Sequence, residues 1–143
     1  MIWLKIVIAL FVMLEIGNIM ILYFMPDSKL ANAMGYFKAW EKSKNDPDVH
    51  AMVKYLVNWV AGTKLIFILL LIVFLVRGDA QTLPFVGVAM TLSIATFFWR
   101  LFPSMKDMDQ NDQIVPKGYS KTLRLMILGM VILFVGATIL SII

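Results

Sequence analysis

The chain contains no cysteine and only one histidine, His50, among its 143 residues. Without cysteine it cannot form disulfides, thiolate metal ligands or a cysteine nucleophile. A single histidine cannot build a multi-histidine metal site or hold a haem from both sides within one chain. Glycine-rich phosphate loops, Gly-x-Ser-x-Gly elbows and His-Glu-x-x-His motifs are also missing. We therefore expect no cofactor, no metal and no catalytic residues, which favours a non-enzymatic function.

Charged residues are scarce as well. They make up 15% of the chain, whereas a soluble domain usually carries about 25%. Hydrophobic residues make up 61%, and the mean hydropathy is +0.85. The core of one small domain cannot hide this much apolar surface, so lipid must act as its solvent.

Four long apolar segments account for this composition. A helix needs roughly 20 residues, at ~1.5 Å each, to cross the ~30 Å hydrocarbon layer. In lipid each span must satisfy its own backbone hydrogen bonds, which predicts that all four are helices. The first span is too long for a secretory signal and contains Glu15, so we interpret it as an uncleaved anchor. The sequence thus predicts an all-α integral membrane protein, a four-transmembrane-helix antiparallel bundle in one domain over residues 1–143, with spans at about 2–24, 55–76, 83–102 and 121–143.

The basic residues are distributed unevenly between the connections. The short second connection has only Arg77. The first and third, with their flanks, carry Lys29, Lys38, Lys42, Lys44 and Lys54, and Arg100, Lys106, Lys117, Lys121 and Arg124, respectively. By the positive-inside rule, connections one and three are cytoplasmic and both termini lie outside, in a cytoplasmic (inner) membrane. The net charge of +4 is therefore an orientation signal, and we expect no nucleic-acid partner.

The first connection is predicted to contain an interfacial helix over about residues 29–44. Leu30, Met34, Phe37 and Trp40 recur at helical spacing, with basic residues largely elsewhere. This amphipathic pattern suits the inner membrane surface. Lying on lipid or against the bundle is the favoured role, and docking of a partner protein is the alternative. Asp46 and Pro47 then predict an N-cap and the first residue of the second long helix.

Two opposite charges fall inside the apolar spans at matching depth. Glu15 and Lys64 each lie about nine residues, or roughly 14 Å, from the inner ends of the first and second spans. Helices joined by a short connection usually pack as antiparallel neighbours. An isolated charge at mid-bilayer costs about 2.5–3.5 kcal/mol, so the two side chains are predicted to pair.

Other polar residues lie near this level. Asn18 is one turn from Glu15, Asn58 precedes Lys64, and Arg100 has a side chain long enough to reach toward Glu15 from the inner end. We expect one buried polar network that contains Glu15, Asn18, Asn58, Lys64 and Arg100. Two interpretations stay open, a structural tie between helices and an ion or substrate path.

Small residues mark a further surface. Gly87, Thr91 and Ala95 recur every four residues in the third span, and Gly129 and Gly136 share a face of the fourth. Such stripes let helices approach closely. Packing within the chain is the favoured use, and a homo-oligomer interface is the alternative.

These patterns favour a small accessory or interaction protein that self-associates in the membrane. Its expected partners are the lipid bilayer and either further copies of itself or another membrane protein. The alternative is a small oligomeric ion- or proton-coupled transporter or channel that uses Glu15 and Lys64. An intramembrane enzyme that binds an anionic lipid through Glu15, Lys64 and Arg100 is a third hypothesis.

Overall fold

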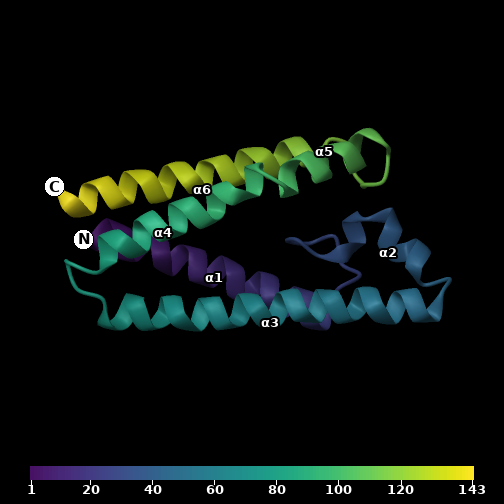
Figure 1. The fold of residues 1–143 in the computed structure, drawn as a ribbon, viewed down its shortest axis with the longest axis horizontal. Coiled ribbons are helices and arrows are strands. Elements are labelled where there is room, and N and C mark those ends of the chain that lie inside the picture. The colour runs from purple at the N-terminus through teal and green to yellow at the C-terminus, as the bar shows by residue number, and fades with distance from the viewer.

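The computed structural model describes all residues from Met1 to Ile143, and the chain is helical with no strand (Figure 1). Its elements in order are α1 (Ile2–Phe24), the 3-10 turn η1 (Met34–Tyr36), α2 (Lys38–Ser43), α3 (Pro47–Arg77), α4 (Leu83–Ala95), the 3-10 turn η2 (Thr96–Phe98), α5 (Leu101–Gln110) and α6 (Tyr119–Ile142). Four helical stretches are long and apolar enough to cross a membrane: Ile2–Phe24, Pro47–Arg77, Leu83–Gln110 and Tyr119–Ile142.

The second long helix begins where the sequence predicts. The Asp46 side chain accepts hydrogen bonds from the backbone N–H groups of Asp48 and Val49, and Pro47 occupies the first turn. This capping satisfies donors that have no partner inside the helix. As a result α3 is 31 residues long and extends beyond the predicted span at its N-terminal end.

The third long stretch is not one regular helix. It changes from α4 to the tighter turn η2 and then continues as α5 to Gln110, well past the predicted end near residue 102. Pro103 explains the irregularity, because proline has no N–H to donate to the carbonyl of Trp99 one turn earlier and its ring crowds that carbonyl. Thr96 also turns its hydroxyl onto the Ser93 carbonyl, at 2.6 Å.

Helix α1 lies at the centre of the fold. It packs along α3 on one side and along α6 on the other, and α4 packs along α6 (Figure 1). Phe11 of α1 meets Phe134 of α6 edge to face, with ring centroids 5.7 Å apart. Although α3 and α4 are consecutive, they barely touch, so the prediction that consecutive helices pack as neighbours does not hold for this pair.

The predicted interfacial helix over 29–44 is wrong as a continuous helix. Ala31 has a positive φ of 50°, and helical structure is confined to η1 and α2. The predicted apolar face is also divided, since Leu30 is 59% exposed whereas Trp40 is 3% exposed. Tertiary contacts outweigh the helical pattern: the Trp40 indole Nε1–H donates to Asp27, at 2.6 Å, and holds the segment folded back on itself.

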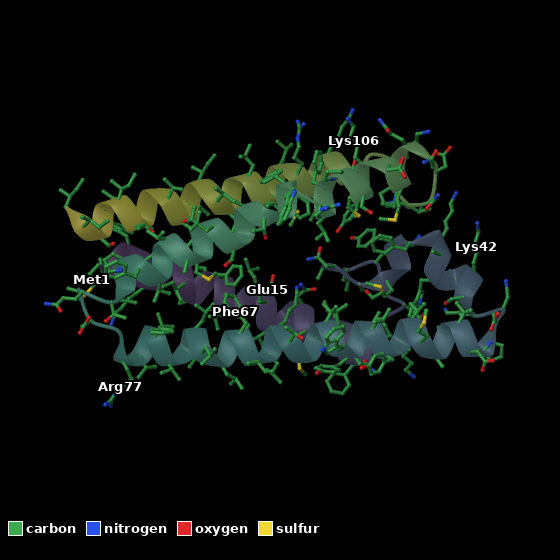
Figure 2. All side chains as sticks on the ribbon, in the orientation of Figure 1. Met1, Glu15, Lys42, Phe67, Arg77 and Lys106 are labelled. Carbon is green, nitrogen blue, oxygen red and sulfur yellow. The ribbon has the colours of Figure 1, made fainter.

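The two connections predicted to share one side of the membrane lie together at one end of the molecule. Lys38 N–H donates to the Gln113 carbonyl and Val115 N–H to the Tyr36 carbonyl, both at 2.9 Å. The rings of Tyr36 and Tyr119 stack with centroids 4.2 Å apart. Lys42 and Lys106 lie at this end, whereas Met1 and Arg77 lie at the opposite end and Glu15 lies between them (Figure 2).

Candidate functional site

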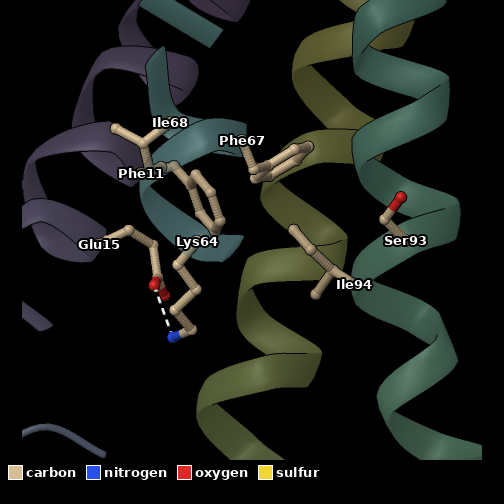
Figure 3. A pocket seen from close by; sticks show the side chains of 7 residues that line it. All are labelled: Phe11, Glu15, Lys64, Phe67, Ile68, Ser93 and Ile94. Atoms are coloured by element: carbon tan, nitrogen blue, oxygen red, sulfur yellow. Dashed lines mark hydrogen bonds and ion pairs between the residues drawn. The ribbon is translucent and has the colours of Figure 1, made fainter. Parts of the chain in front are cut away.

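The structure brings the two membrane-depth charges together. The Lys64 Nζ on α3 lies 2.8 Å from the Glu15 Oε2 on α1 (Figure 3). Their side chains are 31% and 19% exposed, respectively. The contact follows from the close packing of α1 along α3, which sets two residues 49 positions apart in the sequence side by side.

Asn18 joins this pair and links it to the first connection. Its Nδ2 donates to the same Glu15 oxygen, at 3.3 Å, and its Oδ1 accepts from the backbone N–H of Asn32, at 3.2 Å. Asn18 is 4% exposed, so both of its hydrogen bonds are shielded from solvent. The sequence did not predict the contact between Asn18 and Asn32. Its donor is a backbone N–H, which every non-proline residue has, so the residue type gives no indication of it.

Asn58 and Arg100 lie outside the cluster, so the five-residue network is a correction to the sequence prediction. Six residues separate Asn58 from Lys64, which at ~100° per residue turns Asn58 to a different face of α3, and it is exposed. Arg100 is also exposed, with its guanidinium 5.5 Å from the Trp99 ring centroid. That cation–π contact holds Arg100 away from Glu15.

An apolar groove opens beside the ion pair. A cleft of about 200 Å³ is lined by the pair and by Phe11, Phe67, Ser93 and Ile94. A second cleft of about 320 Å³ continues from it between α3 and α4, and the two share Phe67 and Ser93. Figure 3 shows Phe67 and Ile94 facing each other across this space. The groove exists because α3 and α4 do not close against each other, and the sequence did not predict it.

The predicted small-residue stripes divide into a packed set and an outward set. A Cβ on Gly87 would overlap the Thr138 hydroxyl of α6 and press on Leu4 of α1, so close helix approach requires glycine there. Along the same stripe, Thr91 donates its hydroxyl to the Gly87 carbonyl, at 2.9 Å, and Ala95 is half-buried.

Gly129 and Gly136 form the outward set. A Cβ added at either position would meet no atom within 4 Å. The two glycines are therefore not used for packing between the helices of this chain.

Comparison of the chain with family models, with curated proteins and with solved structures finds no match. No group of three or more histidine, cysteine, aspartate or glutamate side chains is placed to hold a metal ion. The features of the molecule that bear on function are the Glu15–Lys64 ion pair, the groove between α3 and α4, and the outward face of α6.

Proposed function

We propose that the chain is a four-spanning, non-enzymatic protein of the cytoplasmic membrane that acts by associating with itself. In this proposal the helices run up-down-up-down as an antiparallel bundle. The ends that carry the basic connections face the cytoplasm, and both termini face outside, in agreement with the positive-inside rule. A reporter fused to the C-terminus should therefore be accessible only from outside, and a cytoplasmic C-terminus would overturn this orientation.

The outward glycine face of α6 is the observation that carries the proposal. Gly129 and Gly136 are seven residues apart, which is about two helical turns, so they lie on one face. A Cβ added at either glycine would meet no other part of the chain within 4 Å. Helices associate in lipid mainly through close packing, for which glycine leaves the backbone accessible. A second copy of α6 would supply the missing contacts.

The surface area of the monomer agrees with association. It exposes 9251 Å², compared with roughly 7,500 Å² for a compact monomer of this mass. Only 17% of the apolar window of α6 is buried inside the chain. The Glu15–Lys64 pair acts in this proposal as a tie that sets how α1 and α3 pack.

Bulky substitutions on this face test the proposal. In single-molecule photobleaching of the protein in lipid vesicles, Gly129→Leu together with Gly136→Leu should shift the population from dimers or larger oligomers to monomers. Gly17→Leu on α1 is the matched control, because Gly17 likewise has no neighbour within 4 Å, and it should leave the distribution unchanged. A wild-type protein that stays monomeric at every protein-to-lipid ratio would refute self-association.

A second candidate function is an oligomeric ion- or proton-coupled transporter or channel. It is favoured by the partial exposure of Glu15 and Lys64 to a cleft, since intramembrane acids often mark ion paths. It is disfavoured because the Glu15 carboxylate is already engaged by Lys64 and Asn18, so it would have to break these contacts to take part in transport. Loss of pH-dependent flux from proteoliposomes in a correctly folded Glu15→Gln variant would support this candidate over the first.

A further inference from the structure

Helices α5 and α6 turn back on each other and meet along a seam at the loop end of the molecule. The Asp109 carboxylate of α5 accepts hydrogen bonds from the N–H and the hydroxyl of Ser120 on α6. One turn away on each helix, Met105 and Leu123 belong to one buried cluster. These two contacts fix an antiparallel register, in which later residues of α5 lie beside earlier residues of α6.

Three basic residues each come immediately after a residue of this seam: Lys106, Lys121 and Arg124. One step along a helix turns about 100° round its axis, so each side chain points to a flank of the seam. In two antiparallel right-handed helices this turn leads to the same flank from both sides. The Arg124 guanidinium accordingly lies 5.9 Å from the ring centroid of Phe102 on α5, and Lys106 projects from the outer side of α5 (Figure 2). We call these three residues the basic patch.

The chain does not neutralise the basic patch. All three side chains are exposed, and none of them forms an ion pair. Of the nearby carboxylates, Asp109 is engaged by Ser120 and Asp112 pairs with Lys117, at 2.9 Å. Asp107 is two residues past the seam, so it turns roughly 200° round α5 and away from the patch. The two cations on α6 are three residues apart and repel each other, and an external anion would offset that repulsion.

The basic patch lies at the depth of phospholipid head groups. From Arg124 to Ile142, where α6 ends, is 18 residues, or about 27 Å, so with Ile142 at one boundary of the ~30 Å hydrocarbon layer Arg124 lies at the other. Lys121 is about 5 Å further toward water, within the roughly 5–7 Å that head groups add on each side. The register of the seam sets Lys106 level with Lys121. Trp99 is 74% exposed near this boundary, where aromatic side chains are common.

The face of α6 next to the basic patch is apolar and uncovered. Leu128 and Val135 lie within about 40° and 20° of Arg124 round the helix, and their side chains are 44% and 39% exposed, respectively. A lipid whose phosphate meets the patch can therefore lay an acyl chain along them. Gly129 and Gly136 lie roughly 140° and 120° round from Arg124, so the proposed self-association uses a different face.

We propose that the basic patch binds the phosphate group of an anionic phospholipid, whose acyl chain follows Leu128 and Val135. Arginine suits phosphate because its guanidinium presents two parallel N–H donors. Three cations without a counter-charge select a head group with net negative charge, since the cationic group of a zwitterionic head would be repelled. The site rests on the membrane insertion of the proposed function, and it depends neither on self-association nor on which end faces the cytoplasm.

Electron spin resonance tests this selectivity, because contact with a membrane protein slows the acyl chain of a spin-labelled lipid. The full-length protein is placed in phosphatidylcholine vesicles with a trace of spin-labelled phosphatidylglycerol or spin-labelled phosphatidylcholine. We expect phosphatidylglycerol to associate at least about twofold more strongly, a ratio that averages one selective site over all lipids around the protein. Equal association would overturn this proposal alone, whereas absence of any slowed lipid would overturn membrane insertion as well.

Two charge-matched double variants locate the site. Lys106→Gln with Lys121→Gln removes exposed side chains and keeps Arg124 on Phe102, so it should fold normally and lose the preference for phosphatidylglycerol. Lys38→Gln with Lys42→Gln removes two exposed, unpaired lysines of α2, and it should keep the preference.

Three outcomes would contradict this assignment. Equal loss of preference in both double variants would show a general attraction to the basic end of the molecule. An unchanged preference after Lys106→Gln with Lys121→Gln would place the site elsewhere. Loss of the wild-type preference on adding inorganic phosphate at constant ionic strength would identify a soluble phosphate, and not a lipid, as the ligand.

Discussion

Replacing Glu15 with glutamine should destabilise the folded protein by about 3 kcal/mol. The substitution leaves the Lys64 ammonium without its carboxylate at a depth of roughly 14 Å, counted at ~1.5 Å per residue from Tyr55. An isolated charge at mid-bilayer costs about 2.5–3.5 kcal/mol, and breaking a buried pair costs about 3–5 kcal/mol. The Lys64 and Glu15 side chains are 31% and 19% exposed, so we expect a cost where these two ranges overlap, at about 3 kcal/mol.

Removing both charges should restore most of that stability. An apolar replacement of a buried ion pair is often neutral or stabilising, so Glu15→Gln with Lys64→Met should lie within about 1 kcal/mol of the wild type. The coupling free energy between the two positions is then at least about 2 kcal/mol. This is well above the roughly 0.3–0.5 kcal/mol within which the effects of independent mutations add.

The free energy of unfolding can be measured for the wild type, Glu15→Gln, Lys64→Met and the double variant in mixed micelles by titration with a denaturing detergent. Lys5→Met is the matched control, because Lys5 is also in α1 but lies near the end of the helix, where its ammonium can reach water. The changes in unfolding free energy caused by Lys5→Met and by Glu15→Gln should be additive in the corresponding double variant. If the effects of Glu15→Gln and Lys64→Met also add within about 0.5 kcal/mol, the pair does not stabilise the fold and the reasoning is wrong.

Three further predictions concern packing and the loop end of the molecule. Gly87→Ala should cost about 1–3 kcal/mol of unfolding free energy by overpacking, and Thr138→Ala should recover part of it by removing the hydroxyl that the new Cβ would meet. Hydrogen bonds from Lys44 and from the Trp40 indole hold the pKa of Asp27 below its usual range. The ionised Asp27 therefore stabilises the fold above its ordinary pKa of 3.8, and this contribution is lost as the pH falls through the lower folded-state pKa. Consequently, Asp27→Asn should lose less stability than the wild type between pH 5 and pH 2. Ile114→Ala should cost about 2–5 kcal/mol, because Ile114 is 2% exposed, and should speed proteolysis of residues 111–118.

Each of these predictions has a contradicting outcome. Equal destabilisation by Gly87→Ala with and without Thr138→Ala would mean that the two residues do not meet. Identical pH profiles for Asp27→Asn and wild type would mean that the contacts of Asp27 with Lys44 and Trp40 do not form in solution. Unchanged proteolysis in Ile114→Ala would mean that the two connections are not held together at that point.

Much of the local structure can be predicted from the sequence because the signals are local. Apolar runs of sufficient length identify the four helices that can cross a membrane, and Asp46 with Pro47 marks the start of α3. Depth counting along two helices predicted that Glu15 and Lys64 could meet, and the structure has them 2.8 Å apart. Helix rise is regular, so the depth of a residue within a span needs no knowledge of its neighbours.

Tertiary contacts decided the remaining features. The 29–44 segment has helical spacing, yet the hydrogen bond between Trp40 and Asp27 and the bridge between Phe37 and Ile114 fold it back against the third connection. The predicted network included Asn58 because it lies only six residues before Lys64 in the sequence, but at ~100° per residue this separation turns Asn58 to a different face of α3.

Packing also decided the groove. The apolar side chains of α3 and α4 can pack equally well against lipid or against protein. The sequence therefore determines that both are apolar helices of membrane length but does not determine whether they contact each other. The close fit of Gly87 against Thr138 and Leu4 lets α4 approach α6 and α1. That fit leaves α3 apart from α4 and opens the groove at whose end Glu15 and Lys64 lie.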